Sequence, residues 1–144
     1  MQANAEGGLL GGGNGRDYDY EVFAPHYLAL PKPQGVAFRA PVPPYSVTMT
    51  AFELAYDTDY EIGTNALPLG EYIDKVVLMA PGSTTHHSDM HARYVETVLD
   101  GTAELIDAVR FRTPPDDKHV PRGIYMLFVV TSAGAVADAV WVVL

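Results

Sequence analysis

Three histidines within six positions raise the question of a metal site. They are His86, His87 and His91 in the stretch PGSTTHHSDMHAR (81–93). Imidazole suits zinc, copper and nickel. On an extended backbone, neighbouring side chains point to opposite sides, so His86 and His87 would not easily share one ion. His87 and His91 meet only if the loop curls back, and Asp89 is the one carboxylate close by in sequence. A three-histidine zinc or nickel site is therefore one hypothesis, and a single ligating histidine is another.

Several other chemistries are excluded by the residue inventory. The chain has no cysteine, which removes disulfides, thiolate-ligated zinc and a thiol nucleophile. A Ser-His-Asp relay from Ser88, His87 and Asp89 fails because adjacent residues on one loop cannot form the nucleophile–base–orienter geometry. No pair of acids stands out for glycosidase chemistry. We therefore predict no catalytic residue in this chain.

Composition narrows the range of partners. The chain has 144 residues, 48% of them apolar, and a net charge of −9. It is long enough for one domain with a real core. Its nine Lys and Arg are scattered singly, which argues against nucleic acid as a partner. No apolar run reaches the ~18–20 residues that a membrane span requires.

The elements that must position these histidines are predicted to be strands. Sustained helical periodicity is absent, and 13 Gly and 11 Pro interrupt the chain at short intervals. Asp100-Gly101 predicts a hairpin turn between two of the strands, and TSAG (131–134) predicts another. About seven short strands of this kind predict an all-β, antiparallel immunoglobulin-like sandwich over residues 41–144. The predicted strands are 45–56, 59–64, 75–80, 93–99, 104–112, 123–130 and 135–144.

Two of these predictions carry alternatives. The segment 104–112 has a spacing that also permits a short helix, although we favour a strand. The aromatic residues Tyr125, Phe128 and Trp141 lie on late strands, where sandwich core is a more common role than a platform for stacking sugars. The remaining histidines, His26 and His119, lie in Pro-rich surroundings and are predicted to be at the surface.

Residues 1–40 differ from the sandwich and are predicted to form an arm and a linker. PHYLALPKPQG (25–35) has the composition of an extended Pro-rich linker. Before it, a glycine-rich turn precedes an alternating strand over 18–23. Such a strand is not stable alone, so it is expected to belong to a larger assembly.

Two long motifs resemble a known family. KVVLMAPGSTTHHSDMHARYV, followed by PRGIYMLFVVTSAGAVADAVWVVL, resembles the C-terminal immunoglobulin-like (early-set) domain of the galactose oxidase and glyoxal oxidase family, the radical-copper oxidases. Upstream, LLGGGNGRDYDYEVFAPHYL is similar to the last segment of that family's kelch propeller. The resemblance covers residues 8–144.

The resemblance implies a role for one histidine. In that family, two His and two Tyr hold a single copper, and one Tyr is linked to a Cys. The C-terminal domain contributes one His, on a loop that reaches through the propeller's channel. The match places that ligand at His86, with His87 and His91 as weaker candidates and Arg93, seven residues after His86, available to order the loop. The chain has no cysteine, and MQANAEGG before the propeller-like segment contains no Tyr-His pair. We therefore expect no oxidase activity, and no cofactor, in the isolated chain.

Two classes of function follow. The first is a non-catalytic module that docks on a propeller domain absent from this chain and offers His86 to its copper. The second is a structural protein that assembles with copies of itself through its N-terminal strand. The family suggests a secreted protein, although the N-terminus has no signal-peptide pattern.

Overall fold

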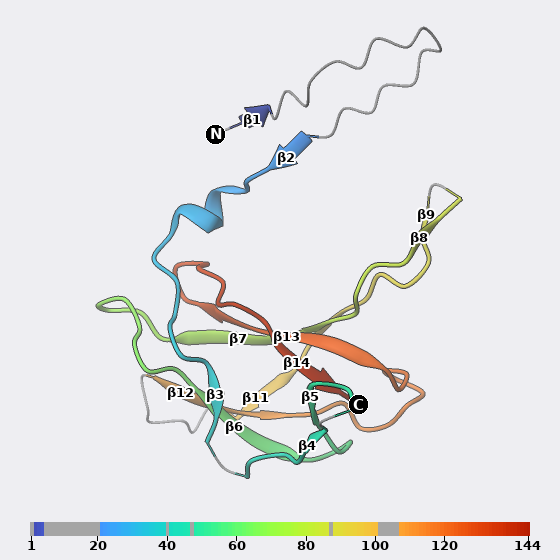
Figure 1. Ribbon diagram of the computed structural model, residues 1–144. Helices are drawn as coiled ribbons and strands as arrows, with labels where there is room; N and C mark the ends of the chain where they lie inside the picture. The colour runs from blue at the N-terminus through green and yellow to red at the C-terminus, as the bar shows by residue number, and fades with distance from the viewer. Residues whose placement is uncertain (1, 5–20, 40, 47, 87, 101–106) are drawn as a thin grey trace, which may run out of the picture.

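The computed structural model describes residues 2–4, 21–39, 41–46, 48–86, 88–100 and 107–144. Two stacked sheets form a β-sandwich, and an N-terminal arm and one hairpin extend from it (Figure 1). The predicted all-β sandwich is confirmed. One pair of strands, β14 with β5, runs parallel, and the other ladders are antiparallel.

The larger sheet has six strands in the order β10-β7-β13-β14-β5-β4. Its centre is the pair β7 and β13, which stay in register from Met126↔Met79 to Val130↔Lys75. Met79 also pairs with Tyr94 of β10. The strands are β4 (Tyr45–Ser46), β5 (Ala51–Glu53), β7 (Ile73–Met79), β10 (Tyr94–Glu96), β13 (Ile124–Thr131) and β14 (Val140–Val143).

The smaller sheet has four strands in the order β11-β12-β6-β3. Its strands are β3 (Ala37–Phe38), β6 (Asp59–Gly63), β11 (Val98–Asp100) and β12 (Ala108–Arg112). The chain passes from the larger sheet to the smaller one at Thr97, whose N–H and hydroxyl both donate to the Val76 carbonyl, at 3.0 and 2.9 Å. The predicted strand 93–99 is therefore two strands, one in each sheet.

Alternation along β13 builds much of the core. Tyr125, Leu127 and Val129 point inward and are almost fully buried, as a strand with one face on the core requires. From the opposite sheet, Ile62 and Phe111 are also fully buried. Burying an apolar side chain of this size contributes about 1.5–3 kcal/mol, so the interface between the sheets is the main source of stability.

Three further predicted strands differ from the structure by more than two residues at one end. The predicted strand 45–56 is instead the hairpin of β4 with β5, which ends at Glu53, because Thr50 has a φ of 52° and turns the chain. The last strand begins at Val140, not 135. The strand prediction for 104–112 is confirmed over Ala108–Arg112, but Asp100 pairs with Arg110, so the connection is longer than a tight Asp-Gly turn. Residues 104–106 of that prediction lie outside the described residues.

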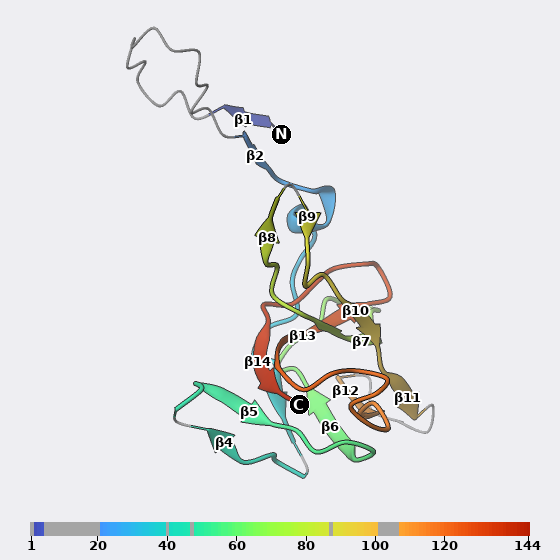
Figure 2. The ribbon, with the colours of Figure 1, turned by 90° about the vertical axis from the view of Figure 1, so that its right-hand side faces the viewer.

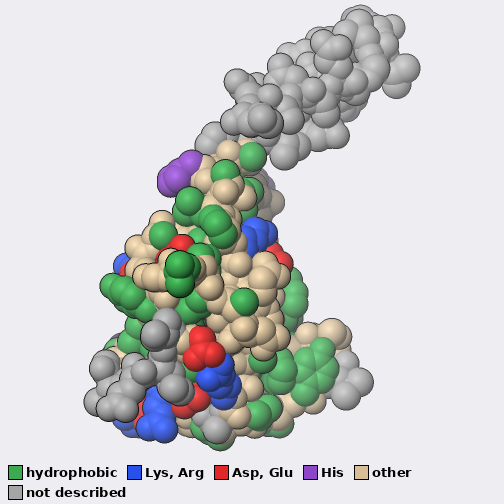
Figure 3. All heavy atoms as spheres, turned by 90° about the vertical axis from the view of Figure 1, so that its left-hand side faces the viewer, with side chains coloured by type: hydrophobic (Ala, Val, Ile, Leu, Met, Phe, Trp, Pro, Cys, Tyr) green, Lys and Arg blue, Asp and Glu red, His purple; other side chains and the backbone are tan. Residues whose placement is uncertain are grey.

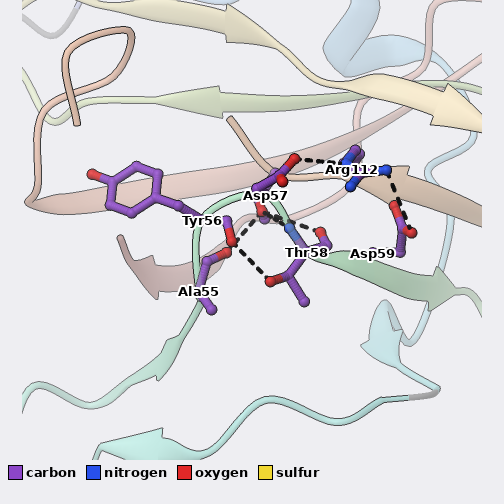
Figure 4. Close-up of polar contacts among 7 residues, drawn as sticks. Ala55, Tyr56, Asp57, Thr58, Asp59 and Arg112 are labelled. Atoms are coloured by element: carbon purple, nitrogen blue, oxygen red, sulfur yellow. Dashed lines mark hydrogen bonds and ion pairs between the residues drawn. The ribbon is translucent and has the colours of Figure 1, made fainter. Parts of the chain in front are cut away.

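A polar corner joins β5 to the smaller sheet. Asp57 has a φ of 50°, and Arg112 lies between Asp57 and Asp59, with Nε 2.9 Å from the Asp57 carboxylate (Figure 4). The buried Thr113 hydroxyl donates to the Ala55 carbonyl at 2.7 Å and accepts the Thr58 N–H at 3.0 Å. One hydroxyl thus satisfies two backbone groups of the turn.

The N-terminal arm lies apart from the sandwich (Figures 1 and 2). β1 (Gln2–Asn4) and β2 (Glu21–Phe23) form a two-stranded antiparallel sheet. The last three residues of the predicted strand over 18–23 form β2, and the others lie outside the described residues. A 3₁₀ turn, η1 (His26–Ala29), leads back to the sandwich.

In the described ranges, the helical structure is too short for any helix to cross a membrane.

We predict that Thr113→Val destabilises the sandwich by about 1–3 kcal/mol, because Thr58 N–H loses its acceptor and Ala55 its donor. The measurement is urea unfolding followed by far-ultraviolet circular dichroism. Thr84→Val, an exposed strand position away from the core, is the matched control. Equal stability of the two variants would contradict the role given to the Thr113 hydroxyl.

Candidate metal-ligand hairpin

Residues 81–93 form a narrow hairpin that extends from the larger sheet. β8 (Thr84–Thr85) pairs with β9 (Ser88–Asp89), in the register Thr84↔Asp89 and Thr85↔Ser88. This register places His86 directly after β8, where the loop of the hairpin begins. Figures 1 and 2 both show the hairpin projecting beyond the sandwich. The motif singled out for its histidines therefore presents its tip away from the core.

His86 occupies the first position of the hairpin loop. Its φ is 52°, in the left-handed region that two-residue hairpin loops require and that non-glycine residues seldom adopt. The side chain is exposed. The backbone at His86 is therefore not extended, contrary to the sequence-based expectation. His87 lies outside the described residues.

Asp89 fastens the base of the hairpin. Its Oδ1 accepts the N–H groups of Ser83 and His91, at 2.9 and 3.0 Å. The Met90 N–H donates to the Ser83 carbonyl at 3.0 Å, which adds a backbone bond across the same neck. A Cβ at Gly82 would lie 3.0 Å from Oδ2 of Asp89, so a glycine leaves room for the carboxylate.

From the sequence alone, Asp89 is only a carboxylate close to the histidines. An aspartate that accepts the N–H two residues later is the pattern that could have identified this role.

These hydrogen bonds favour the ionised form of Asp89. The Ser83 N–H and then the His91 N–H lower the pKa of the carboxyl below its usual range. A lowered folded-state pKa means that the stabilisation of the neck is fully present above the unfolded-chain value of about 3.9. It is lost as the pH falls through the lower, folded-state pKa.

His91, one of the two weaker candidate ligands, is part of the neck and not of the tip. Its N–H is bound to Asp89, and its side chain is half-buried. Among the described residues, no group of three His, Asp or Glu side chains is placed to hold a metal ion. At the root, the Arg93 carbonyl accepts the Ala80 N–H at 3.1 Å. The role of the Arg93 side chain in ordering the loop stays a prediction.

The two remaining histidines are at the surface, as predicted. His26 is exposed on η1, with its ring 6.2 Å from that of Tyr27. His119 is exposed, and its Nδ1 lies 2.7 Å from Oδ1 of Asp116. The His119 side chain is the main cause that lowers the pKa of the Asp116 carboxyl.

We predict that Asp89→Ala loosens the hairpin without unfolding the sandwich, because the Ser83 and His91 N–H groups lose their acceptor. Amide hydrogen exchange should become faster at Ser83 and His91 and stay unchanged in β7 and β13. Asp117→Ala, an exposed loop aspartate, is the control.

In the unmodified protein, the same two amides should lose protection only below about pH 3.9, as Asp89 becomes protonated. Loss of their protection near neutral pH would contradict this account of the neck.

The donor set suits one coordination position. An exposed imidazole at the tip of a fastened hairpin can enter a metal's coordination sphere with little loss of conformational freedom, and imidazole is a good ligand for copper. A complete site needs further ligands. The described part of the chain offers a single donor of this kind, so the geometry fits copper only where another domain supplies the rest.

Comparison with known structures supports the sandwich fold. One similar structure is described as a novel fungal alcohol oxidase with catalytic diversity among the AA5 family, in complex with copper. The TM-score is 0.53 at 17% sequence identity, and the match covers 66% of this chain and 19% of the oxidase chain. The likeness therefore concerns the fold, over about a fifth of that enzyme. No curated protein matches the sequence.

Comparison with family models gives a more specific result. The model described as "Galactose oxidase-like, Early set domain" matches residues 43–144. That range holds both stacked sheets except for β3 and contains the whole candidate hairpin. The chain belongs to the galactose oxidase-like early set domain family.

Proposed function

We propose that this chain is a non-catalytic early-set module that supplies His86 as a copper ligand to a propeller domain. The observation that supports this most directly is the position of His86, exposed at the tip of a hairpin that projects from the sandwich. A buried or strand-bound histidine could not reach a metal held by another domain. The resemblance described above assigns the ligand role to the same residue.

The hairpin suits this task physically. Its neck is fastened by the Asp89 carboxylate, which limits the conformations that His86 samples before a metal binds. Ligands held by supporting hydrogen bonds lose less entropy on coordination. A single imidazole is nevertheless a weak site, and strong copper binding requires the partner's ligands.

The arm would contribute to the same partner. In the family, the segment resembling residues 8–24 belongs to the last propeller blade, and a strand added to a sheet edge gains main-chain hydrogen bonds. β2 lies in that segment and is separated from the sandwich by η1. We infer that the arm completes a blade while the hairpin enters the channel.

The isolated chain would not be an oxidase. The family's radical cofactor links a tyrosine to a cysteine, and this chain has no cysteine. It cannot form that linkage from its own residues.

Self-assembly is the second candidate function. Among the described strands, β1 and β2 pair with each other and not with the sandwich. Two-stranded sheets are marginal alone, and their edges accept further strands. A neighbouring copy could therefore receive the arm.

The copper proposal predicts a result for a mixture of this chain with a galactose oxidase-like kelch propeller prepared without its own early-set domain. The wild-type chain should raise copper retention after dialysis and add a nitrogen ligand to the copper electron paramagnetic resonance spectrum. His86→Ala should abolish both effects. His119→Ala, which changes an exposed histidine elsewhere, is the control. Retention with His86→Ala equal to wild type would refute the ligand assignment.

The assembly alternative predicts a different result. Deleting residues 1–24 leaves η1 and β3 in place and removes the arm. If the arm joins copies of the chain, size-exclusion chromatography should show a concentration-dependent oligomer for the full chain and a monomer for the deletion. A full chain that is monomeric until the propeller is added would favour the copper module.

A further inference from the structure

The larger sheet has an apolar row across its outer face, at the foot of the hairpin. Strand registers place Tyr94 opposite Met79, Met79 opposite Met126 and Met126 opposite Trp141. One residue from each of four neighbouring strands thus forms a continuous line. With strands ~4.8 Å apart, the line is about 14 Å long.

This row faces outward. Its neighbours Leu78, Leu127 and Val142 are fully buried and point into the core, so the alternate positions must point away from it. The exposed fractions are 60% for Tyr94, 38% for Met79 and 45% for Trp141. The prediction that Trp141 belongs to the core is therefore wrong, whereas the same prediction for Tyr125 is confirmed. Apolar side chains gathered in this way mark an interaction surface.

The linker already covers the adjoining part of the same face. Tyr27 and Leu28 line a groove of about 380 Å³ together with Val77, Phe128 and Val130. Two members of the row, Met79 and Tyr94, line one part of the same groove. Phe128 is thus an outward-facing residue and not part of the sandwich core. An ion pair of 3.0 Å between Lys32 and Asp138 fixes the linker beside the groove. The linker between the arm and the sandwich therefore runs over this face.

The hairpin and the arm lie on that same side. Both rise from the side of the larger sheet that faces away from the smaller sheet (Figures 1 and 2). Seen from the side, hydrophobic side chains are scattered over the sandwich and also lie directly below the foot of the arm (Figure 3). Met79 ends β7 and Tyr94 begins β10, so two members of the row are the root of the hairpin.

We propose that the row Tyr94–Met79–Met126–Trp141 is the surface on which the propeller partner sits. This rests on the proposed function and adds the contact face to it. The hairpin limits the occupant, because the chain from Met79 to His86, seven residues further on, can reach up to about 23 Å. A flat partner, such as the same face of a second copy, would collide with it. A partner with a central channel can receive the hairpin and still touch the row.

The surface also specifies the partner's chemistry. The row carries no charged side chain, and two ion pairs lie beside it, Lys75 with Glu96 at 3.2 Å and Lys32 with Asp138 at 3.0 Å. The partner should therefore present an apolar surface around its channel opening. Methionine adapts to irregular surfaces, and tryptophan and tyrosine are common anchors at interfaces.

The test is a titration of the same propeller preparation with this chain, in which calorimetry measures the binding. Met79→Asp and Trp141→Ala should each weaken binding by about tenfold or more. Val98→Asp is the control, since Val98 is 71% exposed but belongs to the other sheet. Thermal unfolding identifies any variant that does not fold, and the other row variant then decides the result.

Each outcome has a distinct meaning. No binding by the wild-type chain overturns the proposed function and this inference with it. Wild-type binding that neither row variant weakens overturns the inference alone, as does equal weakening by Val98→Asp. A dimer of the chain by itself that Met79→Asp converts to a monomer would assign the row to a second copy, and would also overturn it.

Discussion

The pairing of β7 with β10 and β13 is the constraint on which the remaining features depend. Val76 and Leu78 of β7 are buried in the core, and Met79 on the alternate face is exposed. The same strand thus carries part of the core on one face and part of the apolar row on the other. Its end is also the start of the hairpin, and the register Met79↔Tyr94 fixes where the chain must return. A slip of one residue would exchange the two faces and move the root of the hairpin.

Beyond that root, the hairpin depends on local chemistry instead of the core. The ladder β8–β9 has two residue pairs, which is too little to be stable alone. Asp89 supplements it with two hydrogen bonds from a single carboxylate. The positive φ of His86 completes a loop of two residues. The position of the imidazole is therefore set by the rigid sheet, an aspartate neck and a short loop.

The parts of the fold that could be predicted are those where burial imposes a pattern. β6, β7, β12 and β13 follow from alternating or continuous apolar residues. The turn at Thr50 could not be predicted in this way, because threonine seldom adopts a positive φ and no glycine or asparagine marks the position. The passage of the chain from one sheet to the other at Thr97 could not be predicted either. No sequence pattern marks it, because residues 94–100 are suited to one continuous strand.

The candidate site likewise has parts that could be predicted from the sequence and parts that could not. His86 was identifiable because a long motif resembles a family, whereas its place on a turn tip depends on the register of β8 and β9. Trp141 could not be assigned to a face from sequence, because the residues around it, AVWVVL, are all apolar and hide the alternation. In the structure, Val142 is buried and Trp141 is exposed. The apolar row emerges only once four strands are placed in register.

Under the proposed function, the ligand and the row occupy opposite ends of the hairpin, and this separation has a consequence for recognition. The row lies at the root, on a sheet held by the core, while His86 lies at the tip. Contacts at the root of the hairpin can supply the affinity for the partner without constraining the geometry around the metal. The imidazole at the tip can then coordinate the metal without having to supply that affinity. The neck fastened by Asp89 connects the root to the tip. If the hairpin were loose, docking of the root would no longer fix the position of the imidazole. The physical demand that the proposed function places on this chain is therefore to keep one imidazole at a fixed height above an apolar surface.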